Sequence, residues 1–131
     1  MAAKFDDFTR EILDGKNFAT LATLNEDGSP HTSVVWFERE GDHLLITITD
    51  RRKKARNLAR DPRVSLSVLD LENPYRTVDI RGTAELIEDP ERALSYRLTH
   101  RYLGIDPPQD PPGSRRLIVR ITPERVHRFA A

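Results

Sequence analysis

Five cations lie within the six residues 51–56, in the segment TDRRKKARNLARDPR. The formal net charge of the whole chain is zero, so this concentration of charge must have a local cause. The apolar run LITIT precedes the segment, and the pattern predicts a strand that turns into a helix at Asp50, which we expect to cap the helix. Arg52 and Lys54 would then lie in the first helical turn, where free backbone N–H groups and the helix dipole favour an anion. The cluster therefore indicates a site for a phosphate or carboxylate group.

The basic cluster is also compatible with two different roles. A helix face rich in lysine and arginine is often simply solvated. A nucleic-acid interface is the second alternative, but the chain balances 21 basic against 21 acidic residues and contains no helix-turn-helix, zinc or RNA-binding motif. We therefore expect a small anionic ligand and no nucleic acid as the partner of this segment.

The composition excludes several kinds of chemistry. The absence of cysteine excludes disulfides, thiolate metal sites and a cysteine nucleophile, and it suits a reducing cytosol. The four histidines show no metal-ligand spacing, and no GxSxG or P-loop pattern occurs. No apolar run could span a bilayer, and the opening MAAKFDDF is acidic where a secretory signal would be apolar. The sequence thus predicts a cytoplasmic protein with no metal and no membrane span.

The elements that must position the cluster are mostly strands. Turns at Asp27-Gly28 and Gly41-Asp42 divide residues 18–49 into three β-rich runs. Further strands are expected over 63–70, 75–88 and 115–122. The first of these, RVSLSVLD, alternates apolar and polar residues as a half-buried strand does, and the second should bend at Gly82.

Three helices are expected beside the strands. The first covers about residues 6–13 and stops at Gly15, and the second is the basic segment, which Pro62 ends. The third opens at Asp89-Pro90-Glu91, where Asp89 is the expected cap, and closes at Gly104. The proline-rich stretch IDPPQDPPGS is predicted to be an irregular loop.

The number and order of these elements predict the architecture. A chain of 131 residues suits one domain, 1–131. About six strands, mostly consecutive and antiparallel, favour a small β-barrel, because closing the sheet removes its vulnerable edges.

Three stretches carry a family resemblance, namely FATLATLNEDGSPHTSVVWF, TDRRKKARNLARDPRVSLSV and NPYRTVDIRGTAEL. They resemble the pyridoxamine 5'-phosphate oxidase-like (PPOX-class) family of flavin- and deazaflavin-binding split β-barrels, and look most like its actinobacterial branch that uses coenzyme F420. The resemblance covers residues 18–128, and the pattern R-x-K-x-x-N-L followed by D-P-R at 52–63 is fairly specific. It implies a mainly β fold with peripheral helices, a six-stranded antiparallel split β-barrel that forms a homodimer, with two cofactors in grooves between the subunits.

The resemblance also implies where the cofactor would bind. Its phosphate would lie at the strand–helix junction against Arg52 and Lys54. The implied cofactor-binding residues are Thr47, Thr49, Arg52, Lys54, Asn57, Tyr75, His31, Ser33 and Trp36.

Several of these positions suit a plainer role as well. Thr47 and Thr49 are also compatible with ordinary strand positions, and Trp36 with the core of a subunit interface. His31 follows a proline and is typical of a turn or surface histidine. No catalytic residue is assigned, and His31 and Tyr75 are only candidates for a proton donor.

In such a protein the cofactor carries the chemistry, and the chain supplies position and charge. The resemblance implies hydride transfer from reduced F420 to a conjugated small-molecule acceptor of the quinone, enone or tetrapyrrole type. Arg51, Lys53 and Arg56 exceed what one phosphate needs, and with Arg76 they suit a polyanionic tail, which favours F420 over FMN. The alternatives are an FMN-binding oxidoreductase of the same fold and a cofactor carrier without turnover.

Overall fold

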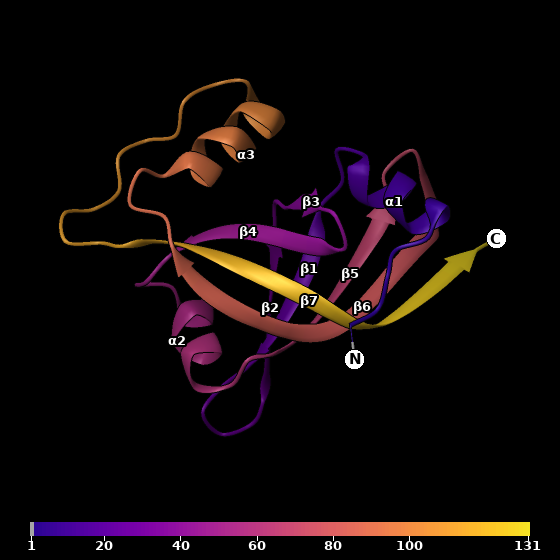
Figure 1. The fold of residues 1–131 in the computed structure, drawn as a ribbon, viewed down its shortest axis with the longest axis horizontal. Helices are drawn as coiled ribbons and strands as arrows, with labels where there is room; N and C mark the ends of the chain where they lie inside the picture. Colours follow the sequence, from indigo (N-terminus) through magenta and orange to yellow (C-terminus); the bar gives the residue numbers. More distant parts are fainter. Residues whose placement is uncertain (1) are drawn as a thin grey trace.

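The computed structural model describes residues 2–131, which form one sheet of seven strands with three helices around it (Figure 1). The strands are β1 (Ala19–Leu24), β2 (Pro30–Val35), β3 (Glu38–Glu40), β4 (His43–Thr49), β5 (Arg63–Asp70), β6 (Asn73–Glu88) and β7 (Arg116–Ala130). The helices are α1 (Asp7–Asp14), α2 (Lys53–Arg60) and α3 (Ala93–Leu103). The strand order is β2-β1-β5-β6-β7-β4-β3 and every neighbouring pair is antiparallel. The predicted class, mainly β with peripheral helices, is confirmed.

The prediction of six strands is wrong by one, because the run between the two predicted turns is broken. The break falls at Trp36 and Phe37, between β2 and β3, where the Phe37 side chain turns into the core. As a result β2 pairs with β1 at one edge of the sheet and β3 pairs with β4 at the other. The sheet is therefore split open rather than closed, and these two short strands are its edges.

The long β6–β7 pair carries the bend predicted at Gly82. The register between the two strands shifts between Arg81 and Gly82, and a Cβ atom on Gly82 would lie 2.0 Å from the carbonyl oxygen of Thr122. Only glycine allows this close approach of two backbones. Past the shift β7 continues to Ala130, so the last strand extends well beyond the predicted end at residue 122.

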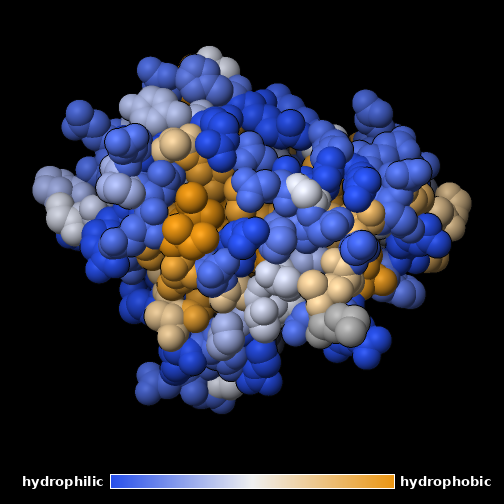
Figure 2. Space-filling view, viewed as in Figure 1, coloured by the Kyte–Doolittle hydropathy of each residue, from blue (hydrophilic) through white to orange (hydrophobic). Residues whose placement is uncertain are grey.

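The side chains of the sheet divide between two faces. One face holds the main core, to which alternate residues of all the long strands contribute, and α1 and α2 pack against it through Ile12, Leu13, Ala55 and Leu58. The other face of β4 and β7 is covered only in part, by α3. The second core cluster lies there and consists of Leu45, Leu94, Leu98 and Tyr102, with Trp36 and Ile118 packed against it. Figure 2 shows the apolar surface that remains where β6 and β7 approach α3.

A carboxylate that precedes helix α3 in the sequence accepts hydrogen bonds from the first turn of the helix. The helix begins at Ala93, later than predicted, with Arg92 at the N-cap position. The carboxylate of Asp89 nevertheless accepts hydrogen bonds from the backbone N–H groups of Ala93 (3.2 Å) and Leu94 (3.0 Å). Asp89 therefore satisfies the helix start as expected, across a turn that the sequence did not indicate.

Candidate cofactor-binding site

The junction between β4 and α2 leaves the start of α2 uncapped. Arg52, not Asp50, occupies the N-cap position, and no side chain caps the helix. The prediction that Asp50 caps α2 is therefore wrong: its carboxylate accepts a hydrogen bond from the Arg115 backbone N–H at 2.9 Å, and thereby joins the junction to the start of β7. The N–H groups at the start of α2 consequently remain available to an external anion.

A cavity of about 220 Å³ opens beside this junction, and we call it the junction cavity. Its lining comes from the end of β2, the partly covered face of β4, the first turn of α2 and the start of β7. The lining residues are Val34, Val35, Trp36, Ile46, Thr47, Ile48, Thr49, Arg52, Lys54 and Arg116. Five of the nine residues predicted from the resemblance thus lie together: Trp36, Thr47, Thr49, Arg52 and Lys54.

Lys54 is held in place by a hydroxyl group. Its ammonium group is half-buried and donates a hydrogen bond to the hydroxyl of Ser33 at 3.0 Å, which brings a sixth predicted residue to the site. Burial lowers the pKa of Lys54, and the neighbouring charge of Arg52 lowers it further. An anion placed between the two cations would oppose both effects, so the site has an electrostatic preference for negative charge.

The basic cluster is free of acidic partners. Within residues 2–131, none of the five cations at 51–56 forms a salt bridge. In contrast, Arg39 pairs with Asp14 at 2.7 Å, and several other arginines pair with carboxylates of their own. Arg51 and Arg56 instead donate to backbone carbonyl groups, those of Pro112 and of Arg51 respectively, both at 2.9 Å. Unpaired like charges on one turn repel one another, which is consistent with a site for an anion.

Arg116 is a member of the site that the sequence did not indicate. It lies opposite Thr49 in the β4–β7 ladder, and its guanidinium group donates to the Thr47 hydroxyl at 3.4 Å and to the carboxylate of Asp110. The pairing with Asp110 lowers the pKa of that carboxyl. The contact depends on the register between strands about 70 residues apart, for which no local signal exists in the sequence.

The lining of the cavity also includes an aromatic side chain, that of Trp36. The ring of Trp36 is stacked on Tyr102 of α3, with centroids 5.1 Å apart and planes 4° from parallel. The Tyr102 hydroxyl donates to the backbone carbonyl of Asn17 at 2.5 Å, which fixes its ring in turn. Such a pair adds about 0.5–1.5 kcal/mol beyond the area it buries. Trp36 is thus held as a flat apolar surface beside the polar part of the cavity.

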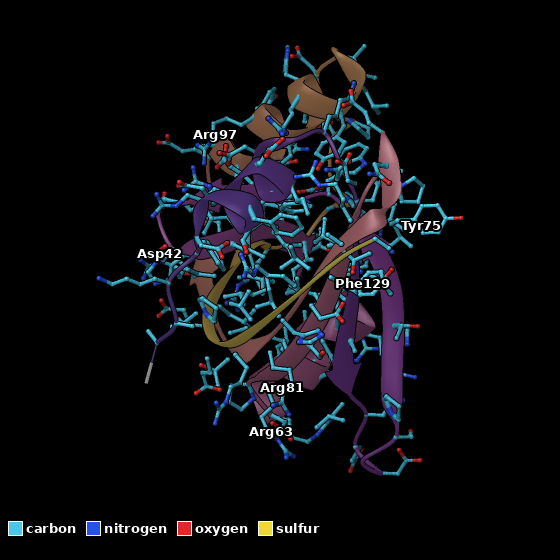
Figure 3. The ribbon with its side chains drawn as sticks, turned by 90° about the vertical axis from the view of Figure 1, so that its right-hand side faces the viewer. Asp42, Arg63, Tyr75, Arg81, Arg97 and Phe129 are labelled. Carbon is cyan, nitrogen blue, oxygen red and sulfur yellow. The ribbon has the colours of Figure 1, made fainter. Side chains whose placement is uncertain are left out.

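The three remaining predicted residues lie outside the junction cavity. Asn57 is buried and points toward β1, where its amide donates to Thr23 Oγ1 (3.0 Å) and Asn25 Oδ1 (3.1 Å). His31 lies near the start of β2, two residues before Ser33. Tyr75, near the start of β6, is 68% exposed and projects away from the protein (Figure 3). Within one chain, none of the three lines the cavity.

The split antiparallel sheet and its cation-lined junction define the class of the protein. The chain belongs to the pyridoxamine 5'-phosphate oxidase family, whose model matches residues 5–130. The predicted split-barrel family is therefore confirmed, with seven strands in place of six.

Individual relatives agree with this assignment. The chain is 31% identical over 103 residues, 72% of each protein, to the 5a,11a-dehydrotetracycline/5a,11a-dehydrooxytetracycline reductase of Streptomyces rimosus. Among solved structures it is similar to an F420 reductase, with a TM-score of 0.80 and 34% identity over 90% of this chain and 94% of the other. It is also similar to a conserved hypothetical protein from Mycobacterium tuberculosis, with a TM-score of 0.78 and 27% identity over 98% and 86% of the two chains.

Over residues 2–131 no helix has the length and apolar character needed to cross a membrane. In the same range no cluster of three or more histidine, aspartate or glutamate side chains could hold a metal ion.

Proposed function

We propose that this protein is an oxidoreductase that binds a phosphate-bearing deazaflavin, coenzyme F420, at the junction cavity. The observation that carries the proposal is the pair of cations without acidic partners, Arg52 and Lys54, beside the hydroxyl groups of Thr47 and Thr49. The names of two relatives, an F420 reductase and a dehydrotetracycline reductase, support a reductase. The acceptor would be a conjugated small molecule of the quinone, enone or tetrapyrrole type.

The residues of the chain would position the cofactor. Arg52 and Lys54 would hold the phosphate by charge-assisted hydrogen bonds, and the hydroxyl groups of Thr47 and Thr49 would bind the polar chain next to it. Trp36 offers a flat face to an aromatic ring system. When bound, the reduced cofactor supplies the hydride, and the protein excludes water from one side of the ring. His31 and Tyr75 lie outside the cavity of one chain, and neither is assigned a proton-donating role.

The surplus of cations favours F420 over FMN. FMN carries one phosphate, whereas F420 adds a lactyl-glutamate tail with further negative charge. Arg51 forms no salt bridge within residues 2–131 and would be available to such a tail, whereas Lys53 and Arg56 line a different hollow with Glu26 and Asp27. Arg76, in contrast, pairs with Asp70 at 3.1 Å and does not add to this charge. FMN remains the alternative cofactor.

A homodimer would complete the site. A cavity of about 220 Å³ is smaller than the roughly 300–1,000 Å³ typical of pockets that bury a small ligand. The chain also leaves large apolar side chains exposed, such as Tyr75 (68%) and Phe129 (52%), near one another at the paired ends of β6 and β7 (Figure 3). We propose that this surface, together with the exposed Val34 at the junction cavity, pairs with a second copy, which would also bring Tyr75 of that copy toward the cavity.

Sedimentation equilibrium tests the dimer. Phe129→Glu places a charge on the proposed interface and should yield monomers with weakened cofactor binding. Leu103→Glu is the matched control, because Leu103 is similarly exposed on α3, away from this surface. A monomeric wild type, or equal behaviour of the two variants, contradicts the proposed interface.

Titration of the purified protein with F420 and, separately, with FMN tests the cofactor. Tight, salt-sensitive binding of F420 with weaker binding of FMN supports the proposal, and the reverse preference favours FMN. Binding of F420 without oxidation of the reduced form by any of a panel of quinones, enones and tetrapyrroles would instead support a carrier. If neither cofactor binds, the cluster at 51–56 is a solvated helix face.

A further inference from the structure

A second cavity lies beside the junction cavity, between the start of α3 and the proline-rich loop. We call it the loop cavity; its volume is about 460 Å³. Its lining residues are Glu88, Pro90, Arg92, Gln109, Asp110, Pro111, Ser114, Arg115 and Arg116. Three arginines therefore face one small hollow, and neither the family resemblance nor the proposed cofactor phosphate uses this space.

The two cavities adjoin through Arg116, which lines both. The backbone of the loop is also tied to the basic segment, because Arg51 donates to the Pro112 carbonyl oxygen at 2.9 Å. Arg116 lines the junction cavity together with Arg52 and Lys54. A ligand with its phosphate at Arg52 would therefore reach the loop cavity by extending past Arg116.

The charges of the loop cavity do not balance. Arg115 pairs with Glu88 at 2.8 Å on the exposed rim. Farther inside, the single carboxylate of Asp110 lies between two guanidinium groups, those of Arg116 and Arg92, and it contacts Arg92 at 3.3 Å. Both arginines therefore share one carboxylate, and the lining carries one more positive than negative charge.

One buried polar atom of the lining, the hydroxyl oxygen of Ser114, has no partner among residues 2–131. The Nε atom of Arg92 makes no hydrogen bond there, but it forms the ion pair with Asp110 at 3.3 Å. Unsatisfied buried groups are rare in native proteins and often mark a place where a ligand or water binds. Arg92 is, in addition, the only described residue other than glycine with a positive φ, 60°. Strained backbone of this kind is often found at binding sites, and here it places Arg92 at the wall of the loop cavity.

We propose that the loop cavity is a second anion site, which takes a distal carboxylate or phosphate of the same ligand whose first phosphate lies at Arg52 and Lys54. The Ser114 hydroxyl would donate to that group, the guanidinium group of Arg92 would attract it, and Arg116 would face both anions. This inference rests on the proposed function for the first anchor. The ligand class it specifies is a cofactor with at least two separate anionic groups, which excludes FMN as the best ligand.

Two variants test the site with F420 and FMN as probes. Arg92→Asn removes the guanidinium group and keeps a residue type that tolerates positive φ. We expect about tenfold weaker F420 binding and less than about twofold weaker FMN binding, because only F420 carries a distal anion. Ser114→Ala removes a hydroxyl group that is unsatisfied without ligand, so the fold should be no less stable while F420 binding weakens about threefold. Arg97→Asn, on the exposed face of α3, is the matched control and should change neither affinity.

The outcomes separate this inference from the proposed function. Equal losses of affinity for F420 and FMN would mean that Arg92 and Ser114 only support the shape of the first site, which contradicts a second site. Unchanged F420 affinity in both variants would also overturn the second site. If the wild type binds no F420, the proposed function fails. Binding of inorganic pyrophosphate then tests separately whether the loop cavity is an anion site. A thermal shift with pyrophosphate that is lost in Ser114→Ala and Arg92→Asn supports an anion site there, and a shift that persists or is absent in the wild type overturns it.

Discussion

The ammonium group of Lys54 donates a hydrogen bond to the hydroxyl of Ser33 at 3.0 Å, and thereby ties α2 to β2, an edge strand of the sheet. The same contact aims the charge of Lys54 into the junction cavity, beside Arg52. A lysine held by a hydroxyl rather than a carboxylate keeps its full charge for a ligand. The position of the candidate site thus follows from how one helix is attached to one edge of the sheet.

Replacing Lys54 should weaken cofactor binding without loss of fold. We expect Lys54→Ala to cost about 1–3 kcal/mol of binding free energy, the scale of one charge-assisted hydrogen bond. Fluorescence titration with F420 at two salt concentrations measures the change, and the salt dependence should also decrease. Lys16→Ala removes the same charge from a position outside the cavity and serves as the control. Equal affinities for wild type and Lys54→Ala would remove Lys54 from the site.

The same lysine should make stability depend on pH. Burial, and then the charge of Arg52, lower the pKa of Lys54 from its ordinary 10.5. Between the lowered pKa and 10.5 the unfolded chain binds this proton more tightly than the folded chain, so stability rises with pH in that window. Below the window Lys54 is charged in both states, but only the folded chain buries the charge, and this desolvation destabilises the fold.

Lys54→Met should therefore be more stable than the wild type at neutral pH. The difference should shrink as the pH rises through the window, because the wild type then loses the buried charge. Urea unfolding of both proteins over a pH series measures this difference. A wild type that is at least as stable as Lys54→Met at neutral pH would show that the hydrogen bond to Ser33 outweighs the desolvation of the charge.

Local signals were sufficient for most of the fold. Alternating residues marked β5, and the turns at Asp27-Gly28 and Gly41-Asp42 lie between strands as predicted. The break at Trp36 and Phe37 left no such signal, because both residues are as compatible with a strand as with a turn. What decides it is the burial of Phe37 in a core to which most strands and the helices α1 and α2 contribute.

The residue pattern alone predicted the candidate site only where it is contiguous in sequence, and the family resemblance added Ser33, Trp36, Thr47 and Thr49. The run of cations from 51 to 56 identified the junction, but Arg116 reaches it through strand register, and its partner Asp110 lies in a loop without regular structure. Asn57 is the converse case. It belongs to the motif that identified the family, yet the helix turns its side chain toward Thr23 rather than into the cavity.

Gly82 should be intolerant of any side chain. The Cβ atom of Gly82→Ala would lie 2.0 Å from the Thr122 carbonyl oxygen, and backbone on both sides limits relaxation. We expect a loss of at least about 1–3 kcal/mol in the free energy of unfolding, typical of overpacking at a closely packed position. Thermal and urea unfolding measure it, with Thr83→Ala in the same strand as control. A variant as stable as the control would mean that β7 can move away from β6 at the register shift.

The stack of Trp36 on Tyr102 should be visible in fluorescence, because Trp36 is the only tryptophan of the chain. Tyr102→Phe keeps the stacked ring but removes the donor to the buried Asn17 carbonyl, so it should cost about 1–3 kcal/mol of stability. Tyr102→Leu also loses the stack, which adds about 0.5–1.5 kcal/mol and frees the indole ring. We expect a red shift of the tryptophan emission in Tyr102→Leu and little change in Tyr102→Phe. F420 affinity should follow the same order, since Trp36 can present a fixed face to the cofactor ring only while Tyr102 holds it. Identical emission in the two variants would show that the ring of residue 102 does not hold Trp36 in place.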